Sequence, residues 1–273
     1  MGIPTLWQHL RAEGHEATLL KQFPSTPLPP NAFYRIDILA SFYSTIRRIH
    51  TTSPDQNTFN TIFEQHLISH GIPKTSVLYI DGPSPAEKSA TRETRETKRT
   101  RALQKAQACI SDMEVRVGGQ RRVRKRDFNK LFKNIRDAFY WSQESRNSLA
   151  EYLRNNGWRA FICLSEADTA IAFECQPNDI VISGDSDMLI YDTVVTIWRP
   201  LSRGRYLVYE LAEVLSHLEI SRSKLTTLGI VSKNDYSSNL KRLGVITNHK
   251  IVKSLEETEA GNYNFRFKLS ARP

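Results

Sequence analysis

The sequence predicts an α/β fold with a largely parallel sheet flanked by helices. Short apolar runs of strand length alternate with longer segments of helical spacing along the 273 residues. The composition, with 40% hydrophobic and 25% charged residues, supplies a core and excludes a mostly disordered chain. No apolar run approaches the ~18 residues that a membrane-spanning helix needs. An intracellular type of α/β protein is therefore expected, with three cysteines too few and too scattered for a disulfide framework.

The first predicted strand follows a loop, residues 22–31, that holds four prolines. The strand occupies residues 34–39 and leads into a helix over residues 41–50, SFYSTIRRIH. A second helix is predicted over residues 59–70. It ends at Gly71, because glycine accepts the backbone conformation of a helix C-cap.

The second predicted strand, residues 75–80, is followed directly by Asp81. The segment Gly82–Pro85 then breaks the chain, since it contains two prolines and a glycine. Residues 86–111 have the composition of a long, highly charged helix. Residues 112–127, which contain two adjacent glycines and the run RRVRKR, predict a loop or a mobile arm.

A long helix is predicted over residues 128–155 and is closed by Gly157. The third strand follows over residues 158–164, WRAFICL. Ser165 is a favourable N-cap residue for a helix that starts at Glu166.

The last third of the chain predicts three further strands and then helices. The strands are expected at residues 179–183, 193–198 and 205–208. The helices are expected at residues 210–219, 222–232 and 237–257, before a weakly patterned tail at 260–273. No internal repeat and no low-complexity tract is visible.

Positive charge is concentrated in one segment. Between Lys88 and Arg136 the chain has 16 Lys and Arg against five Asp and Glu, a net charge of +11. The rest of the chain has 22 basic and 24 acidic residues. Such a segment is typical of a polyanion partner, because phosphate contacts release bound counterions. The alternative is an ordinary solvated helix or arm.

Carboxylates follow the predicted strands at or just after their carboxyl ends. They are Asp37, Asp81, Glu166, Asp168, Asp185 and Asp187, with Asp235 later in the chain. Right-handed crossovers place such strand ends along one edge of the sheet, where ligands bind. Clustered carboxylates stay ionised only if cations neutralise them, and oxygen ligands favour Mg²⁺ or Mn²⁺. Two such ions about 4 Å apart are the arrangement used for phosphodiester cleavage.

Each acid alone has a simpler interpretation. An Asp after a strand is often a turn former or a helix N-cap. The sequence GDSD also resembles part of a calcium loop, but it lacks the remaining EF-hand residues. A phosphatase of the haloacid dehalogenase type needs an early D-x-D motif, which Asp37-Ile38-Leu39 does not provide. The acids together, in a chain with a basic arm, favour a metal centre.

These residues resemble the flap endonuclease/XPG-type nucleases, a branch of the PIN-like superfamily, from Met1 to about residue 257. The likeness is strongest in MGIPTLW, RIDILASFY, YIDGPSPAEKSATRETR, LSEADTAIAFE, VISGDSDMLIY and GIVSKNDYSSNLKRLGV. It implies one PIN-like domain over residues 1–273. Its parts would be XPG-type regions at 1–111 and 141–200, a basic helical gateway or arch at 86–140, and a helix–two-turn–helix-like region at 210–257.

The resemblance implies a role for each of the seven acids. Asp37, Asp81 and Asp168 would hold a first Mg²⁺ with Glu166 acting through water, and Asp185 and Asp187 a second Mg²⁺ with Asp235 nearby. Mn²⁺ is an alternative to Mg²⁺. Seven carboxylates exceed the charge of two divalent ions, so positive side chains are expected to approach the site.

The resemblance also implies the residues that contact nucleic acid. Lys88 and Arg95 lie seven and fourteen residues after Asp81, two helical turns apart on one face, and would contact the scissile phosphate as catalytic groups. Tyr43 would stack on a base, and Gly2 would lie near the active site. Further basic contacts are expected from Arg92, Arg99, Arg121, Arg122, Arg124, Lys125 and Arg126. The alternatives are a solvated helix face for Lys88 and Arg95 and an ordinary core or interface position for Tyr43.

The C-terminal region departs from the family pattern. The G-x-G of the helix–two-turn–helix is reduced to Gly244 alone, and the usual glycine before Asp235 is absent. These changes argue against K⁺ binding and duplex recognition at this element. No clamp-binding motif follows.

The sequence therefore predicts an Mg²⁺-dependent structure-specific nuclease for DNA with 5′ single-stranded character, with a role in repair or replication. The alternative is a nucleic-acid-binding PIN-like scaffold or RNA regulator with weak or no catalysis. We expect DNA rather than RNA as the partner, a monomer that does not bind membranes, and a nuclear location inferred from the basic run 121–126.

Overall fold

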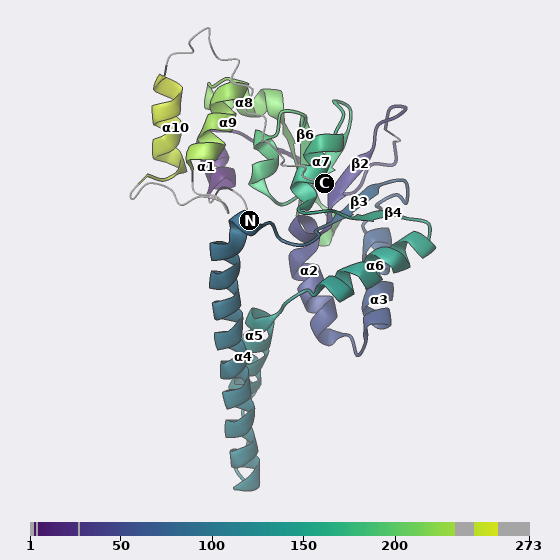
Figure 1. Ribbon diagram of the computed structural model, residues 1–273, viewed down its shortest axis with the longest axis vertical. Helices are drawn as coiled ribbons and strands as arrows, with labels where there is room; N and C mark the ends of the chain where they lie inside the picture. The colour runs from purple at the N-terminus through teal and green to yellow at the C-terminus, as the bar shows by residue number, and fades with distance from the viewer. Residues whose placement is uncertain (1–2, 4, 27, 233–242, 256–273) are drawn as a thin grey trace.

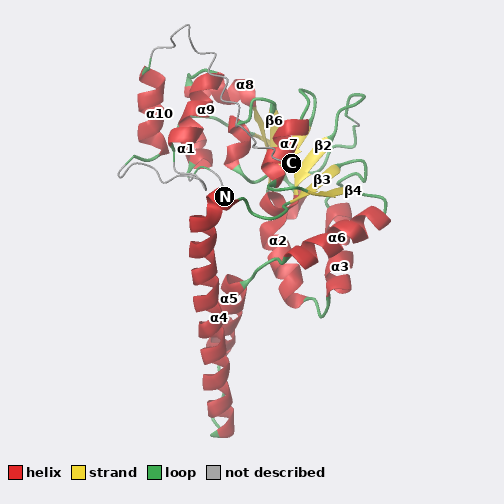
Figure 2. Ribbon diagram, viewed as in Figure 1, coloured by secondary structure: helices red, strands yellow, loops and turns green. Residues whose placement is uncertain are grey.

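A computed structural model describes residues 3, 5–26, 28–232 and 243–255 of the chain. A seven-stranded sheet lies between two layers of helices, and a long two-helix hairpin projects from this body (Figure 1). Figure 2 shows the central strands enclosed by helices on both sides. The α/β prediction is confirmed. Within the described ranges, no helix is both long enough and apolar enough to cross a bilayer.

The sheet has the strand order β1-β7-β6-β5-β2-β3-β4. Its strands are β1 (Thr18–Leu20), β2 (Tyr34–Asp37), β3 (Val77–Ile80), β4 (Arg159–Ile162), β5 (Ile180–Ile182), β6 (Thr196–Pro200) and β7 (Tyr206–Glu210). Strands β2 to β6 pair in parallel, and β7 is antiparallel to both β6 and β1. The chain moves from β2 outward to β4 and returns on the other side of β2 at β5. Open sheets of this class bind ligands at such a reversal of strand order.

Two helix layers cover the sheet (Figure 1). One contains α2 (Ile38–Thr52), α3 (Gln56–Ser69) and α6 (Gln143–Asn155). The other contains α1 (Leu6–Ala12), α7 (Ala167–Glu174), α8 (Leu211–Leu218), α9 (Arg222–Val231) and α10 (Val245–Ser254). Because strand side chains alternate between faces, Leu78 and Ile80 pack in the first layer's core, whereas Val77 and Tyr79 pack in the second.

The projecting hairpin consists of α4 (Ser89–Gly118), which follows a short 3-10 turn η1 (Ala86–Lys88), and α5 (Lys125–Ala138). At 1.5 Å per residue, the 30 residues of α4 span about 45 Å. The predicted loop over 112–127 is therefore wrong, because helix continues to Gly118 and restarts at Lys125. Arg116 stabilises this part by pairing with Asp112 on its own helix at 2.7 Å and with Asp127 on α5 at 3.1 Å.

The single helix predicted over 128–155 is also wrong, because the chain breaks between α5 and α6. Phe139 and Trp141 are buried at this break, and the indole Nε1 of Trp141 donates to Ser145 Oγ at 3.0 Å. Ser142 caps α6 by accepting from the Ser145 amide at 3.2 Å. The break lets two aromatic side chains enter the core beside the base of the hairpin.

Smaller differences from the prediction concern the ends of single strands and helices. Asp37 ends β2 and caps α2, so the first strand is shorter than predicted. Glu166, not Ser165, is the N-cap residue of α7. Gly71 has the expected positive φ, +73°, just after α3. The elements α1 and β1 were not predicted, and of the helix expected over 237–257 the structure describes α10.

Candidate active site

Asp37 lies where β2 meets α2, at the reversal of strand order. Its side chain is 5% exposed, and Oδ1 accepts from the Ala40 amide at 2.9 Å. Oδ2 accepts from Ser183 Oγ at 3.5 Å, at the end of the neighbouring strand β5. Asp37 is thus held by its own helix and by the adjacent strand end.

Asp81 follows β3 and connects to the start of α7. Its Oδ1 accepts from the Ala167 amide at 2.8 Å, which places the carboxylate beside the predicted pair Glu166 and Asp168. Gly82 makes this approach possible, because a Cβ there would lie 1.9 Å from the Cys163 carbonyl oxygen. A larger residue at Gly82 would push the ends of β3 and β4 apart.

Asp185 and Asp187 follow β5. Asp185 lies just before the 3-10 turn η2 (Ser186–Ile190), and Asp187 lies within it. Asp185 Oδ1 accepts from the Asp187 amide at 3.1 Å, and the Asp185 amide donates to Ser183 Oγ at 3.1 Å. Gly184 allows the loop to approach α2, since a Cβ there would lie 2.6 Å from the Ala40 carbonyl oxygen. The loop therefore packs against the same helix start that Asp37 caps.

The electrostatics show that these loops converge. Burial raises the pKa of Asp37 well above its usual range, and the charges of Asp81, Asp168 and Asp185 raise it further. Burial also raises the pKa of Asp81, against the lowering effect of the Ala167 amide. The six predicted acids that the structure describes thus gather at one edge of the sheet.

Tyr191 connects the two predicted metal groups. Its hydroxyl donates to Asp168 Oδ2 at 3.1 Å. Burial raises the pKa of Tyr191, and the charges of Asp168 and Asp187 add to this effect. The phenol is therefore a neutral donor between both groups of acids. Sequence reasoning missed it because a tyrosine after a 3-10 turn carries no specific signal.

Two cations face the carboxylates. The buried Lys88, at the start of α4, donates from Nζ to Glu166 Oε1 at 2.7 Å. Arg146 on α6 donates from Nη1 to the carbonyl oxygens of Asp81 at 3.2 Å and Gly82 at 3.0 Å. Both cations lower the pKa of Asp81. Lys88 was predicted from the sequence, whereas Arg146 was missed because it is 65 residues from Asp81.

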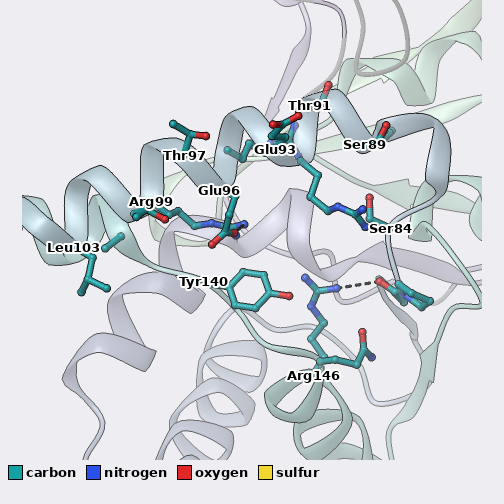
Figure 3. Close-up of a pocket in the computed structure, with 18 residues that line it drawn as sticks. Ser84, Ser89, Thr91, Glu93, Glu96, Thr97, Arg99, Leu103, Tyr140 and Arg146 are labelled. Atoms are coloured by element: carbon teal, nitrogen blue, oxygen red, sulfur yellow. Dashed lines mark hydrogen bonds and ion pairs between the residues drawn. The ribbon is translucent and has the colours of Figure 1, made fainter.

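A groove of about 950 Å³ lies between the first turns of α4 and the start of α6. Figure 3 shows Arg99 on α4 facing Tyr140, with Arg146 pointing toward the chain just after β3. The guanidinium of Arg99 lies 4.5 Å from the centre of the Tyr140 ring. Arg92 and Arg95 also line this groove. Its walls therefore combine guanidinium groups with an aromatic face, as sites for single-stranded nucleic acid do.

A second cavity of about 390 Å³ shares Arg95, Arg99 and Arg146 with this groove and reaches Asp185. Tyr43 lies in its wall and is 42% exposed, so it is not a core tyrosine. The structure thus places Tyr43, Arg95 and Arg99 along one opening that leads to the acids. The roles of these side chains in binding or catalysis remain predictions.

The basic run lies elsewhere. Arg121, Arg122, Arg124, Lys125 and Arg126 are exposed at the tip of the hairpin. The length of α4 separates them from the acids by about 45 Å. They could contact only a distant part of a nucleic acid that enters the groove. Gly2 and Asp235 lie outside the described residues.

The acidic cluster has a consequence for stability. Burial, and next the charge of Glu166, raises the pKa of Asp168 from 3.8 to about 6, while Lys88 acts in the opposite direction. Between these two pKa values the folded protein binds more protons than the unfolded chain, so the free energy of unfolding falls as pH rises through this interval. Above pH 6 the destabilising contribution is about 3 kcal/mol.

We therefore expect Asp168→Asn to raise the thermal unfolding midpoint of the metal-free protein, and to raise it more at pH 7 than at pH 5. Unfolding in EDTA, followed by circular dichroism, measures both increments. The comparison between two proteins at each pH cancels the contribution of histidines such as the partly buried His66, whose lowered pKa of about 4 has the opposite effect on the pH dependence. Equal increments at both pH values would mean that Asp168 titrates in its ordinary range.

No family model and no curated protein matches the sequence. Solved structures do match the fold. The catalytic core of Rad2 in complex with DNA substrate is 18% identical with a TM-score of 0.55, over 92% of this chain and 68% of that one. Flap endonuclease-1 from Methanococcus jannaschii is 20% identical with a TM-score of 0.51, over 88% of this chain and 76% of that one. With its mostly parallel sheet and its acids at the strand ends, the chain has the fold of the Rad2/XPG and flap endonuclease nucleases.

Proposed function

We propose that the protein is a divalent-metal-dependent, structure-specific nuclease that hydrolyses phosphodiester bonds in DNA with 5′ single-stranded character. The observation that carries this proposal is the convergence of carboxylates at and after the ends of β2, β3 and β5 and at the start of α7, beside a cavity lined with arginines. The likeness in fold to Rad2, solved with a DNA substrate, supports DNA as the partner. A role in repair or replication and a nuclear location are parts of the same proposal.

The residues present fit divalent cations. The six described carboxylates outnumber the two cations beside them, Lys88 and Arg146, so the ionised site lacks positive charge. Burial raises the pKa of Asp37, Asp81 and Asp168, and neighbouring carboxylates add to this effect. Asp37, Asp81 and Asp168 would hold one ion with Glu166 through water, and Asp185 and Asp187 would hold the other, with Asp235 nearby. The bound ions would supply a water of lowered pKa and stabilise the leaving oxygen. Oxygen ligands favour Mg²⁺ and also accept Mn²⁺.

The chain's own side chains position the substrate. Lys88 and Arg95 would contact the scissile phosphate and stabilise the charge that develops on it. The half-exposed ring of Tyr43, in the wall of the same cavity, would stack on a base next to the cleaved bond. The larger groove would hold the 5′ single strand against Arg92, Arg99 and Tyr140. All of these contacts lie within one proposed PIN-like domain over residues 1–273.

The decisive test compares substrates and metal. Labelled 5′-flap DNA, plain duplex, single-stranded DNA and single-stranded RNA are incubated with the protein in Mg²⁺ or in EDTA, beside the variant Asp187→Asn. We expect cleavage of the flap substrate in Mg²⁺ only, and none by the variant. Tight binding without cleavage of any substrate would instead support a nucleic-acid-binding scaffold or an RNA regulator.

The hairpin tip should contribute to affinity and not to chemistry. We expect the double variant Arg121→Gln/Arg122→Gln to bind single-stranded DNA more weakly and to reduce the slope of log K against log salt by about 1.4, as two lost phosphate contacts require. Its cleavage rate at saturating substrate should stay unchanged, because the tip lies far from the acids. Fluorescence anisotropy at several salt concentrations measures the slope. The matched variant Lys21→Gln/Arg203→Gln, away from the hairpin, should leave it unchanged.

Arg146 should act through Asp81. Its two hydrogen bonds hold the Asp81–Gly82 backbone, and its guanidinium lies 5.6 Å from the centre of the Trp141 ring. We expect Arg146→Ala to weaken the apparent Mg²⁺ affinity or the cleavage rate by about tenfold to a hundredfold, as removal of a group that orients a metal ligand does.

An Mg²⁺ titration of the cleavage rate measures this effect. Arg154→Ala is the matched control on the same helix, because Arg154 donates to the Ala160 carbonyl at 3.3 Å without approaching the acids. If the two variants behave alike, Arg146 only stabilises the fold.

A further inference from the structure

A second group of possible metal ligands lies between α1 and α10. His9 lies on α1 and Glu13 is the C-cap residue of the same helix, four residues further on, and His249 faces them from α10. One ligand atom from each of the three side chains lies within 4.8 Å of the other two. The imidazoles are buried, with 2% and 3% of their surface exposed, whereas the Glu13 side chain is 40% exposed. The group is therefore closed on the imidazole side and open at the carboxylate.

The ring of His249 is oriented as in a metal site. Its Nε2 lies 2.9 Å from the Leu218 carbonyl oxygen, which can only accept, so Nε2 carries the proton. In the neutral ring, Nδ1 then presents its lone pair toward His9 Nε2, 2.9 Å away. Metal-bound histidines almost always donate their other nitrogen to a carboxylate, a backbone carbonyl or a water, which fixes the tautomer.

The charge state of His9 also suits a cation. Burial, and next the proximity of His249, lowers the pKa of His9, against the raising effect of Glu13. Neutral imidazole is the form that binds metal. The alternative is a direct N–H···N hydrogen bond between the two rings. Tetrahedral zinc, with Zn–N bonds near 2.0 Å, separates two nitrogens by about 3.3 Å, so the rings would move apart by only a few tenths of an ångström.

We propose that His9, Glu13 and His249 bind a zinc-type divalent cation, with the fourth position open to solvent beside Glu13. Two imidazoles and one carboxylate select borderline cations such as Zn²⁺, whereas Mg²⁺ prefers oxygen ligands alone. This site is separate from the acidic cluster in both its residues and its preferred ion.

The position of the site gives it a structural role. The indole Nε1 of Trp7 on α1 donates to the Gly184 carbonyl at 3.2 Å, and Ser186 Oγ donates to the Ile3 carbonyl at 3.2 Å. The N-terminal segment thus holds the loop that carries Asp185. A cation shared by α1 and α10 would fix α1 to the C-terminal helices and so steady this loop.

Metal binding by the full chain tests the proposal directly. Zinc-free protein, kept in excess Mg²⁺, is titrated with ZnCl₂ by calorimetry. Its thermal unfolding is followed with and without Zn²⁺. We expect one Zn²⁺ per chain and a rise in the unfolding midpoint for the wild type. Asp185→Asn should behave in the same way, which separates this site from the acidic cluster. His249→Gln should lose the binding, and Glu13→Gln should weaken it at least tenfold.

The controls keep the test independent of nuclease activity and of folding. His70→Gln removes a histidine from another close pair, whose ring centres are 4.0 Å apart on and just after α3, and should leave zinc binding unchanged. Glu13 is exposed, so Glu13→Gln retains the fold and decides the question if His249→Gln does not fold. Unchanged zinc affinity in Glu13→Gln and a folded His249→Gln would overturn the proposal and leave a hydrogen-bonded histidine pair.

Discussion

Replacing Asp185 by asparagine should abolish cleavage, with a rate at least about a thousandfold below the wild type, which corresponds to about 4 kcal/mol of lost transition-state stabilisation. The carboxylate lies beside Asp37 and Asp168 at the reversal of strand order and in the wall of the cavity that contains Arg95 and Tyr43. Asparagine keeps its size but loses the charge that a divalent cation requires. Single-turnover cleavage of a labelled 5′-flap substrate in Mg²⁺ measures the loss.

Substrate binding should survive this change. The removal of a negative charge next to a phosphate cannot weaken the attraction of the groove for DNA, so anisotropy in EDTA should show equal or tighter binding. Asp192→Asn is a matched control, because Asp192 is an exposed aspartate just after the same 3-10 turn η2 and pairs with Arg222 at 3.2 Å. Cleavage by Asp185→Asn at the wild-type rate would refute the assignment of this carboxylate to a metal.

The acids could be predicted from the sequence because their positions follow local rules. The six described acids end a short apolar strand or follow one within a few residues, and parallel strands bring their ends to one edge whatever the rest of the chain does. Arg146 and Tyr191 follow no such rule. Arg146 reaches the acids only because buried Phe139 and Trp141 break the helix before it and set the direction of α6. His9 and His249, 240 residues apart, meet only through the packing of α1 on α10.

The errors in the hairpin have a similar cause. The run of charges around residues 112–127 has little apolar periodicity, so local patterns indicated a loop. In the structure, Arg116 pairs with Asp112 along α4 and with Asp127 on α5, and the two helices stabilise each other. Tertiary ion pairs and helix packing therefore override the local preference. Ser142, which caps α6, was a signal for the break at residues 139–142 that apolar spacing concealed.

Lys88→Met should lower the cleavage rate by about a hundredfold to a thousandfold, the range found when a donor to transition-state charge is removed. Lys88 Nζ lies 2.7 Å from Glu166 Oε1 and lowers the pKa of Asp81 and Asp168, so it is directed at the place where the cations and the scissile phosphate would meet. Methionine keeps an unbranched apolar side chain, one atom shorter than lysine, and removes the ammonium group. Because binding relies mainly on the groove, the substrate Kd should change much less than the rate.

The matched control is Lys98→Met, which removes a lysine from the same helix at an exposed position outside both cavities. Loss of Lys88 also removes its ion pair with Glu166, so the metal-free variant should unfold at a lower temperature, and Mg²⁺ should recover part of that loss by neutralising the carboxylates. The two readouts separate the possible roles. A lower unfolding midpoint with an unchanged cleavage rate in saturating Mg²⁺ would make Lys88 a structural counter-ion, whereas loss of rate in a variant restabilised by Mg²⁺ can only come from the chemistry at the phosphate.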